Sequence, residues 1–343
     1  MSFSHDIIII GQGLAGTALS ESLADAGARV MMFDIPLANR SSVVAAGAVN
    51  PIVLRRFVPS WRASEMLAIA GAFYRELELQ YEASLWKPTQ LIEIFPTAQE
   101  AGLWRLRMKE AELQHLLALG PGDDAGAAIL PQPYGSGIIK RCATLDIPQL
   151  LRVHREHWIS AGLLEERMVD ASDVRGIPGG VEVHGRTAPY VVYCAGPFHQ
   201  VDGLVPVRGE GLTVRLPGLD VRSMVHRGLF LVPLGDERFR IGATFAWSDV
   251  WSGPTEEGKR SLLERLSRFW TGEVQVLDHW AGVRPAAKDR RPILGRTGEH
   301  TMVFSGLGSR GALLAPWCAD HLAAHILKGE PLDPEVDVAR FRV

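Results

Sequence analysis

The sequence predicts an α/β fold of two domains, one built on a parallel sheet and the other on a mostly antiparallel sheet. Two observations indicate the parallel sheet. The glycine spacing GxGxxG occurs at residues 11–16 and again at residues 306–311, and each copy follows a short apolar run. A third observation indicates the antiparallel sheet, because apolar and polar residues alternate through much of the stretch 212–245.

Each glycine turn is typical of a crossing from a strand to a helix. Such a turn presents free backbone N–H groups, which bind phosphates and other electron-rich groups. Asp34 ends the next apolar run, about 20 residues after the first glycines, where an acid meets a ribose hydroxyl in dinucleotide folds. The first turn by itself suits NAD or FAD. The second turn predicts that the chain returns to this nucleotide domain at its end, so the Rossmann-like domain is discontinuous.

The N-terminal elements are predicted from local patterns. Residues 6–34 predict a strand, the glycine turn, a helix ending near Gly27 and a second strand. A loop of small and polar residues follows at 40–47. A helix is expected from Ser60, because apolar residues then recur at helical spacing, and residues 91–95 have a strand pattern. Residues 120–137 are rich in Gly, Pro and Ala and are expected to form a surface loop.

The later elements have their own signals. Asp146 is expected to cap a helix with Pro148 in its first turn, which stops at Gly162. Gly179 and Gly180 predict a hairpin, and residues 190–196 a buried strand. The alternating sheet runs to Phe245, and an amphipathic helix through residues 262–270 crosses it. We therefore expect a discontinuous nucleotide-binding domain of residues 1–85, 145–200 and 285–343, and a substrate domain of residues 86–144 and 201–284.

Composition and charge exclude several classes of protein. The 343 residues are 47% apolar and 22% charged, which suits two folded domains, and the net charge of −3 gives no footprint for nucleic acid or acidic membranes. No apolar run is long enough for a membrane span, so a cytoplasmic protein is expected. Cys142, Cys194 and Cys318 lack CxxC spacing and are expected to be reduced and buried. The His pairs at 154/157 and 321/325 lack completing acids, and no metal site is expected.

Ordered sequence blocks in the C-terminal third carry a family resemblance. They are Leu-Val-Pro at 231–233, Ile-Gly-Ala-Thr at 241–244, Trp-Ala-Gly-Val-Arg-Pro from 280, Pro-Ile-Leu-Gly at 292–295 and the stretch 306–316. With these blocks the chain resembles the D-amino acid oxidase superfamily of FAD enzymes, and within it the glycine oxidases, over nearly its whole length. The Gly-Leu-Gly-Ser-Arg-Gly block is also similar to the FAD half of a bifunctional enzyme that modifies the wobble uridine of tRNA.

The resemblance implies FAD rather than NAD. The small residues at 45–47 agree with this, because they let a flat ring lie against the backbone. Sarcosine oxidases carry a flavin-linking cysteine close to the position of Ala286, so the FAD is expected to be noncovalent. The first glycine turn and residues 40–42 are implied to hold the pyrophosphate, Asp34 the ribose, and residues 308–311 the pyrimidine end of the flavin, where a helix dipole stabilises the reduced ring. The residues expected to bind the cofactor are Gly11, Gly13, Leu14, Ala15, Gly16, Asp34, Arg40, Ser41, Ser42, Ala45, Ala46, Gly47, Val169, Ala195, Gly196, Gly306, Gly308, Ser309, Arg310 and Gly311.

The resemblance also implies a substrate site. Arg284 matches the arginine that pairs with the amino acid carboxylate in glycine oxidases, and a guanidinium suits this task because it makes two parallel charge-assisted bonds. The implied reaction passes hydride from the α-carbon of a small amine or amino acid to the flavin, and the imine then hydrolyses. Phe230 stands where glycine oxidases have a carboxylate-binding tyrosine, which favours a larger or more apolar substrate than glycine. Ser309 aligns with a second arginine of glycine oxidases, and Arg310 lies one place along.

Several alternatives stay open. Arg284 is either the substrate anchor or an ion-pair partner of Asp289, and Arg310 either contacts substrate or caps backbone carbonyls. The arginines at 55, 56 and 62 are either solvated or a site for an anionic substrate. Two other functions compete with amine oxidation: a flavoenzyme that acts on tRNA wobble uridine, and a non-catalytic flavin-binding subunit of a complex. The electron acceptor is oxygen or another molecule, and an oligomer is compatible with the sequence.

Overall fold

A six-stranded sheet forms one half of the protein, which a computed structural model describes for residues 3–122 and 124–342. Its neighbouring strands are parallel except at the β19 edge. All four isoleucines of β1 are buried, as expected for a parallel sheet covered on both faces. In spatial order the strands are β19 (Ile293–Arg296), β20 (Thr301–Ser305), β13 (Tyr190–Tyr193), β1 (Ile7–Ile10), β2 (Val30–Phe33) and β9 (Leu164–Glu165).

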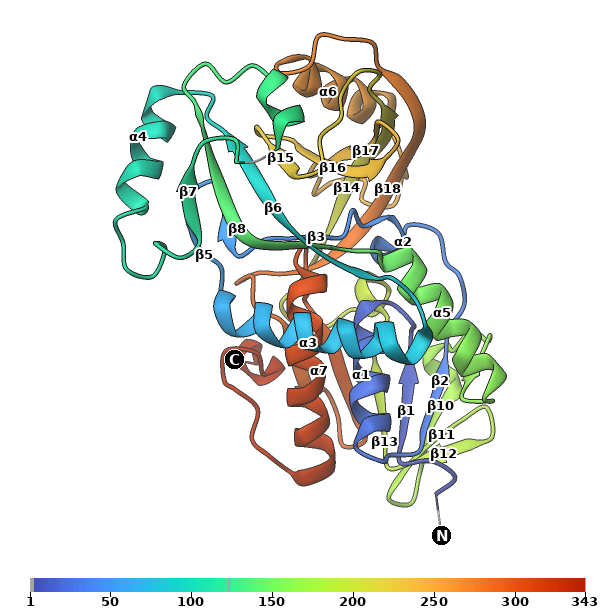
Figure 1. The fold of residues 1–343 in the computed structure, drawn as a ribbon. Coiled ribbons are helices and arrows are strands. Elements are labelled where there is room, and N and C mark those ends of the chain that lie inside the picture. Colours follow the sequence, from blue (N-terminus) through green and yellow to red (C-terminus); the bar gives the residue numbers. More distant parts are fainter. Residues whose placement is uncertain (1–2, 123, 343) are drawn as a thin grey trace.

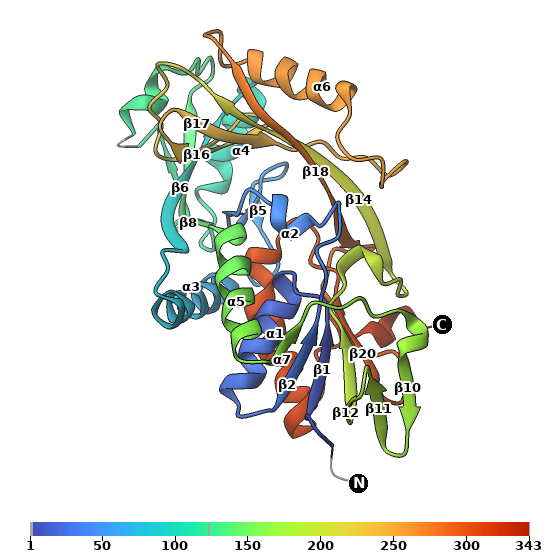
Figure 2. The ribbon, with the colours of Figure 1, turned by 90° about the vertical axis from the view of Figure 1, so that its right-hand side faces the viewer.

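Different layers cover the two faces of this sheet (Figure 2). On one face lie α1 (Leu14–Asp25), α5 (Ile147–Ser160) and α7 (Gly311–Lys328), and α3 (Ala63–Tyr81) packs on α7. A small antiparallel sheet of β10 (Val174–Ile177), β11 (Gly180–Val183) and β12 (Arg186–Ala188) covers the other face. Ile7 and Ile9 belong to the helical core, whereas Ile8 and Ile10 pack under the small sheet. The alternation of side chains along β1 therefore feeds two separate cores.

A nine-stranded, mostly antiparallel sheet forms the other half (Figure 1). One of its pairings, between β15 and β6, is parallel. Its strands are β18 (Gln275–Ala287), β14 (Leu204–Arg215), β17 (Arg238–Gly242), β16 (Phe230–Gly235), β15 (Met224–His226), β6 (Trp86–Ile94), β8 (Ser136–Leu145) and β3 (Ala48–Val49), with β7 (Leu117–Leu119) beside β8. Leu212, Val214 and Ile241 pack under α6 (Glu256–Ser267), so one face of this sheet is covered by a helix.

The remaining elements are short, apart from α4 (Ala98–Arg107), whose first turn is capped by Thr97. They are α2 (Ser41–Val44), β4 (Ile52–Val53), β5 (Val58–Pro59), and the 3-10 turns η1 (Ala125–Ile129), η2 (Ala171–Asp173), η3 (Gly196–Phe198) and η4 (Val338–Phe341). No helix within the described ranges is long and apolar enough to cross a membrane.

Most of the predicted elements are present. The α5 prediction is confirmed in detail, since the Asp146 side chain accepts a hydrogen bond from the amide of Gln149 and the helix ends before Gly162. The three cysteines are buried and unpaired. Three predictions need correction. The surface loop at 120–137 contains η1 and the start of β8, α6 stops at Ser267, and the alternating strand ends at Gly242, short of Phe245. The sequence analysis also gave no signal for α4.

The predicted division into domains remains an expectation, and the sheets show where it is imprecise. Most strands of each sheet come from the expected segments of the chain. However, β3 lies within residues 1–85 and pairs with β8 of the nine-stranded sheet, and β18 crosses the expected boundary at residue 285. At β3 and β18, residues assigned to the nucleotide domain therefore form part of the nine-stranded sheet. Both strands contribute residues to the wall of the cavity described next.

Candidate active site and cofactor cavity

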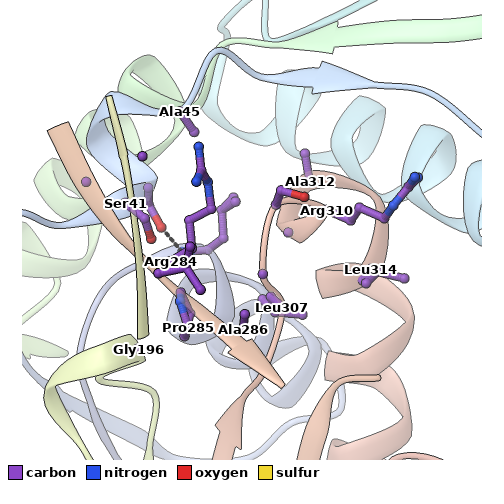
Figure 3. Close-up of a pocket in the computed structure, with 18 of the residues that line it drawn as sticks. Ser41, Ala45, Gly196, Arg284, Pro285, Ala286, Leu307, Arg310, Ala312 and Leu314 are labelled. Atoms are coloured by element: carbon purple, nitrogen blue, oxygen red, sulfur yellow. Dashed lines mark hydrogen bonds between the residues drawn. The ribbon is translucent and has the colours of Figure 1, made fainter. Parts of the chain in front are cut away.

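Both glycine turns line one cavity of about 2190 Å³, whose walls come from the two sheets. Small-molecule pockets usually measure about 300–1,000 Å³, so this cavity has room for a dinucleotide together with a second ligand. Figure 3 shows residues from both halves of the chain around it, including Ser41, Gly196, Arg284 and Leu307. The N-terminal and C-terminal glycine turns therefore lie in the wall of the same cavity.

In the first glycine turn, segments of backbone pack directly on one another with no side chain between them. Gly11 has a φ of +103°, and a Cβ at Gly16 would lie 1.9 Å from the carbonyl oxygen of Gly11. Leu14 begins α1, and its amide donates to Ser42 Oγ at 3.2 Å. Gly11, Gly13, Leu14 and Ala15 line the cavity, whereas Gly16 does not. Gly16 instead lets α1 pack on the turn, so the expected pyrophosphate contact is better placed on the residues before it, which line the cavity.

Asp34 is held between two arginines. Its Oδ2 accepts bonds from Arg40 Nη1 at 3.1 Å and from Arg155 Nη1 at 2.6 Å, and its Oδ1 accepts the amide of Gln12 at 2.9 Å. Asp34 also lines the cavity, as a ribose-binding residue requires. Arg155 was missed by the sequence analysis. It comes from α5, 121 residues away from Asp34 in the chain. No local sequence pattern distinguishes it from the other arginines on the exposed faces of helices.

The loop at residues 45–47 lies flat against the second sheet. Gly47 has a φ of +69°, and a Cβ there would lie 1.9 Å from the carbonyl oxygen of Leu145. The carbonyl oxygen of Ala45 accepts a bond from Arg240 Nη1 at 2.6 Å. Arg40 forms a bridge with Val283 of β18, which ties the preceding residues to the same sheet. Residues 40–42 and 45–47 all line the cavity, so this loop forms one of its walls.

The second glycine turn opens α7 toward the cavity. Of the four amides expected to face the flavin, that of Gly308 donates to the carbonyl of Pro285 at 2.9 Å and that of Arg310 to the carbonyl of Leu307 at 3.1 Å. The amides of Gly308 and Arg310 are therefore already used within the protein. The expected amide contacts to the flavin now rest on Ser309, Gly311 and the start of α7. Gly306 and residues 308–311 line the cavity.

The Arg310 side chain turns away from Arg284 (Figure 3). Its guanidinium donates to the backbone carbonyls of Asn50 at 3.1 Å and Ile52 at 3.2 Å. Burial lowers the pKa of Arg310. These contacts are those of the capping alternative, in which the arginine fixes residues 50–52 beside α7.

Arg284 rises from β18 into the cavity (Figure 3). Its guanidinium lies over Gly209, where a Cβ would be 1.9 Å from Nη2, and 4.5 Å above the ring of Phe245. Nη1 donates to the carbonyl of Thr244 at 3.3 Å. Within residues 3–122 and 124–342 no carboxylate forms an ion pair with it, and Asp289 pairs with Arg340 instead. The ion-pair alternative is therefore wrong. Burial lowers the pKa of Arg284 to about 10, so it remains charged at neutral pH.

Strand register places further side chains on the same face as Arg284. Directly paired residues share a face of a sheet. Following the pairs from β18 through β14, β17, β16 and β15 to β6 puts the following residues on this face: Arg284, Gly209, Trp280, Gly242, Arg240, Phe230, His226 and Glu93. All of them line the cavity, and α6 covers the opposite face. Of this set, the sequence analysis selected Arg284 and Phe230 as candidate site residues.

Three polar residues on this face, Arg240, His226 and Glu93, were missed by the sequence analysis. The Nε of Arg240 is buried without a hydrogen-bond partner among the described residues, and burial lowers its pKa. His226 Nδ1 and Glu93 Oε2 are 2.8 Å apart, although 133 residues separate them in the chain. Burial raises the pKa of Glu93, and the contact with His226 opposes that rise. Only the pairing of β15 with β6 brings this histidine and carboxylate together.

Other predicted residues divide between the cavity and the surface. Val169, Ala195 and Gly196 line the cavity, as Asp34 does. Arg55 and Arg56 also line it, whereas Arg62 bonds Asp333 and lies over Trp61 and Trp317. Among the described residues, no group of three His, Cys, Asp or Glu side chains is placed to hold a metal ion.

The residues of the cavity fit FAD. Glycine at positions 11 and 47 lets these two turns of the cavity wall pack directly on the backbone of Cys194 and Leu145, and two helices of 12 and 18 residues begin at the wall. Helix N-termini favour negative charge, which suits a pyrophosphate at α1 and an electron-rich ring edge at α7. Asp34 supplies a carboxylate for a ribose, and the 45–47 loop supplies a side-chain-poor wall for a flat ring.

Comparison with known proteins agrees with this fit. The family model "FAD dependent oxidoreductase" (DAO) matches residues 6–325. Glycine oxidase of Bacillus licheniformis is 25% identical, over 96% of this chain and 95% of that protein. The tRNA 5-methylaminomethyl-2-thiouridine biosynthesis bifunctional protein MnmC of Marinobacter nauticus is 28% identical over 93% of this chain, which spans 55% of that protein's length. The crystal structure of glycine oxidase from Geobacillus kaustophilus superposes with a TM-score of 0.82 at 24% identity, covering 99% of this chain and 98% of that one. The chain belongs to the DAO family of FAD-dependent oxidoreductases.

Proposed function

We propose that this enzyme oxidises a small amine that carries a carboxylate, and that it prefers a substrate larger and more apolar than glycine. The observation that carries the proposal is Arg284. Its guanidinium faces the cavity with one bond to a backbone carbonyl and with no carboxylate of the described chain beside it. A partly buried guanidinium of this kind favours an anionic ligand, because a charge taken out of water needs a partner.

The walls around Arg284 support an apolar substrate. Phe230, Phe245 and Trp247 line the cavity, and Trp280 lies over Gly211 beside them. Glycine oxidases have a tyrosine at the Phe230 position by resemblance, so the ring is kept here but the hydroxyl that would contact the substrate is lost. An aromatic wall gains free energy from apolar area, at about 25 cal/mol per Å² buried, which glycine cannot supply.

These positions suggest a separate role for the cofactor, for Arg284 and for the aromatic residues. FAD supplies the hydride acceptor when it is bound. Arg284 holds the carboxylate and so fixes the distance and angle of the neighbouring carbon, while the aromatic residues exclude water. The glycine turns hold the cofactor from both ends. The acceptor that reoxidises the cofactor is oxygen or another molecule, and we propose noncovalent FAD because Ala286 occupies the wall after Pro285.

Anaerobic flavin bleaching tests the proposal. The FAD-loaded protein is mixed with D-amino acids, N-methyl amino acids, proline analogues and glycine, and the loss of flavin absorbance is timed. We expect a bulkier, apolar member of the panel to bleach the flavin fastest. If no member bleaches it, the proposed reaction is wrong, and if glycine is fastest, the inference from Phe230 is wrong.

A matched pair of arginine variants tests the anchor. Arg284→Ala should raise KM about 10- to 150-fold, since a charge-assisted hydrogen bond contributes about 1.5–3 kcal/mol, and should leave FAD bound. Arg215→Ala removes an exposed arginine of β14 that pairs with Glu237, and should leave KM unchanged. An equal KM in the wild type and in Arg284→Ala would contradict the assignment.

A second candidate function is action on an amine attached to tRNA. It is favoured by the similarity to the Marinobacter nauticus protein and by Arg55 and Arg56, which lie in the cavity wall. The net charge of −3 disfavours it, because binding to RNA depends on neutralising phosphates. A filter-binding titration with tRNA at low and moderate salt distinguishes the two: salt-sensitive binding would support the tRNA function, and no binding at either salt concentration would dismiss it.

A further inference from the structure

The His226–Glu93 pair lies in the wall of the cavity without a role in the proposal so far. Glu93 is only 3% exposed, and its Oε2 is 2.8 Å from His226 Nδ1. Among the described residues, Glu93 is the only hydrogen-bond partner of the His226 ring, so Nε2 has none. A carboxylate that fixes one ring nitrogen holds the other in one direction, as an acceptor for a proton.

The pair lies beside Phe230, a wall residue of the proposed substrate site. His226 is the direct cross-strand partner of Phe230, and their rings are 4.8 Å apart. Glu93 is in turn the direct partner of His226 on β6. The three side chains therefore form one row across the cavity face of the sheet, and Phe230, a wall residue of the proposed substrate site, lies directly beside this pair.

We propose that His226, positioned by Glu93, takes the proton from the substrate ammonium group before hydride transfer. This inference rests on the proposed function. At neutral pH an amino acid is an ammonium ion, which has no free electron pair on nitrogen to assist loss of hydride. A base within the cavity removes that barrier, and general bases of this kind contribute about 10²–10⁴-fold to a rate.

The step balances in protons and electrons. One N–H bond of the ammonium breaks, its electron pair stays on nitrogen, and the proton forms a bond to His226 Nε2. The proposed oxidation then removes a hydride from the α-carbon, for which bound FAD would supply the acceptor, and leaves an iminium ion, which water hydrolyses to a carbonyl compound and an ammonium or alkylammonium ion. Glu93 compensates the positive charge that His226 gains, so the pair as a whole becomes neutral rather than cationic.

Charged side chains from three other places in the chain lie near the pair, namely Glu100, Arg227 and Arg265. Glu100 of α4 lies near enough to Glu93 to raise its pKa, although less than burial does. Arg265 of α6 donates to the carbonyl of Gly228, two residues from His226, and Arg227 follows His226 directly and donates to the carbonyl of Arg268. Arg227 is the next residue in the chain and Arg265 reaches the following loop from α6, so among the described residues Glu93 is the acidic side chain that contacts the His226 ring.

The pH dependence of His226→Gln tests the proposal against its matched control. His279 forms a similar pair with Glu210 at 3.1 Å, but it follows the opposite face of the sheet and does not line the cavity. With the fastest substrate of the bleaching panel, we expect His226→Gln to lower kcat/KM about 100-fold at pH 7 and to recover the wild-type value above the pKa of the substrate ammonium, where no base is needed. His279→Gln should keep the wild-type pH profile. Glu93→Gln should follow His226→Gln with a smaller loss.

A binding measurement gives a second readout. The α-methyl analogue of the same substrate has the ammonium and carboxylate but no α-hydrogen, so it binds without being oxidised. Calorimetry in two buffers counts the protons released on binding at pH 7. We expect the wild type to retain the ammonium proton on the pair, and His226→Gln to release it to the buffer or to bind at least tenfold more weakly.

The outcomes separate the two proposals. If no amine bleaches the wild-type flavin, the proposed function fails. If an amine bleaches it and His226→Gln keeps the wild-type pH profile and proton count, the role of His226 alone is wrong. A loss of kcat/KM that is equal at all pH values would mean that the pair is structural, and would also overturn the inference.

Discussion

Replacing Gly209 by alanine tests the position of Arg284 without touching Arg284 itself. A Cβ at residue 209 would lie 1.9 Å from Nη2, 2.2 Å from Cζ and 2.3 Å from Nη1 of Arg284. Reaching the 3.4 Å of ordinary contact requires a shift of about 1.5 Å of the guanidinium. The group that moves is the end of a flexible side chain, so we expect the free energy of unfolding to change by less than about 1 kcal/mol. A misplacement of about 1 Å at a positioning group can lower a rate about 100-fold. We therefore expect kcat/KM to fall about 10- to 100-fold, mainly through KM.

The assay combines steady-state kinetics, flavin content and thermal unfolding. Gly176→Ala is the matched control, because Gly176 lies on β10 with no atom within 4 Å of a new Cβ. It should change none of the three measurements. The double variant Gly209→Ala/Arg284→Ala should be no worse than Arg284→Ala, since both changes act on one contact. An unchanged KM in Gly209→Ala, or a loss in the double variant equal to the sum of the two single losses, would refute the reasoning.

Three further predictions concern the cofactor end, the Arg310 cap and the buried histidine. Arg155→Met should raise the Kd for FAD about three- to tenfold, because Asp34 loses a 2.6 Å charge-assisted bond, and an unchanged Kd in a fluorescence titration would contradict this. Arg310→Met leaves two backbone carbonyls without a donor and should lower the free energy of unfolding by about 1–3 kcal/mol in urea; no change would show that the cap is dispensable. Burial lowers the pKa of His154 to about 3, so below pH 6.5 the unfolded chain binds a proton that the folded chain does not. Stability from this group is therefore lost as pH falls from 6.5, by about 1.4 kcal/mol per unit, while Glu21, whose pKa burial raises, acts with the opposite sign. His154→Gln should accordingly lose less stability than the wild type between pH 6.5 and 5, and equal losses would refute the assignment.

Local signals in the sequence determined the parallel half of the fold. The isoleucines of β1, the glycine turn and Asp34 lie within 30 residues, and their order specifies a strand, a helix and a second strand without reference to the rest of the chain. The cap of α5 is equally local, because Asp146, Pro148 and Gly162 act on one helix. Alternation likewise predicted the face of the second sheet under α6, where Leu212 and Ile241 are buried.

The sequence also indicated the family and the cofactor, because the ordered blocks of the C-terminal third carry the resemblance, whereas the first glycine turn by itself suits NAD or FAD. It selected Arg284 through the neighbouring residues that carry the resemblance. What it could not decide was the set of groups that surround this arginine. The guanidinium lies flat only because residue 209 of another strand has no side chain, and pairing of β14 with β18 decides that.

Tertiary structure alone decided the remaining contacts of the site. The bond from Arg155 to Asp34 spans 121 residues, and the pair of His226 and Glu93 spans 133. The parallel pairing of β15 with β6, inside a sheet that alternation marks as antiparallel, brings that pair to the cavity. Contacts of this kind depend on strand order and register, which are set by the packing of whole sheets and leave no periodic signal in the segments that they join.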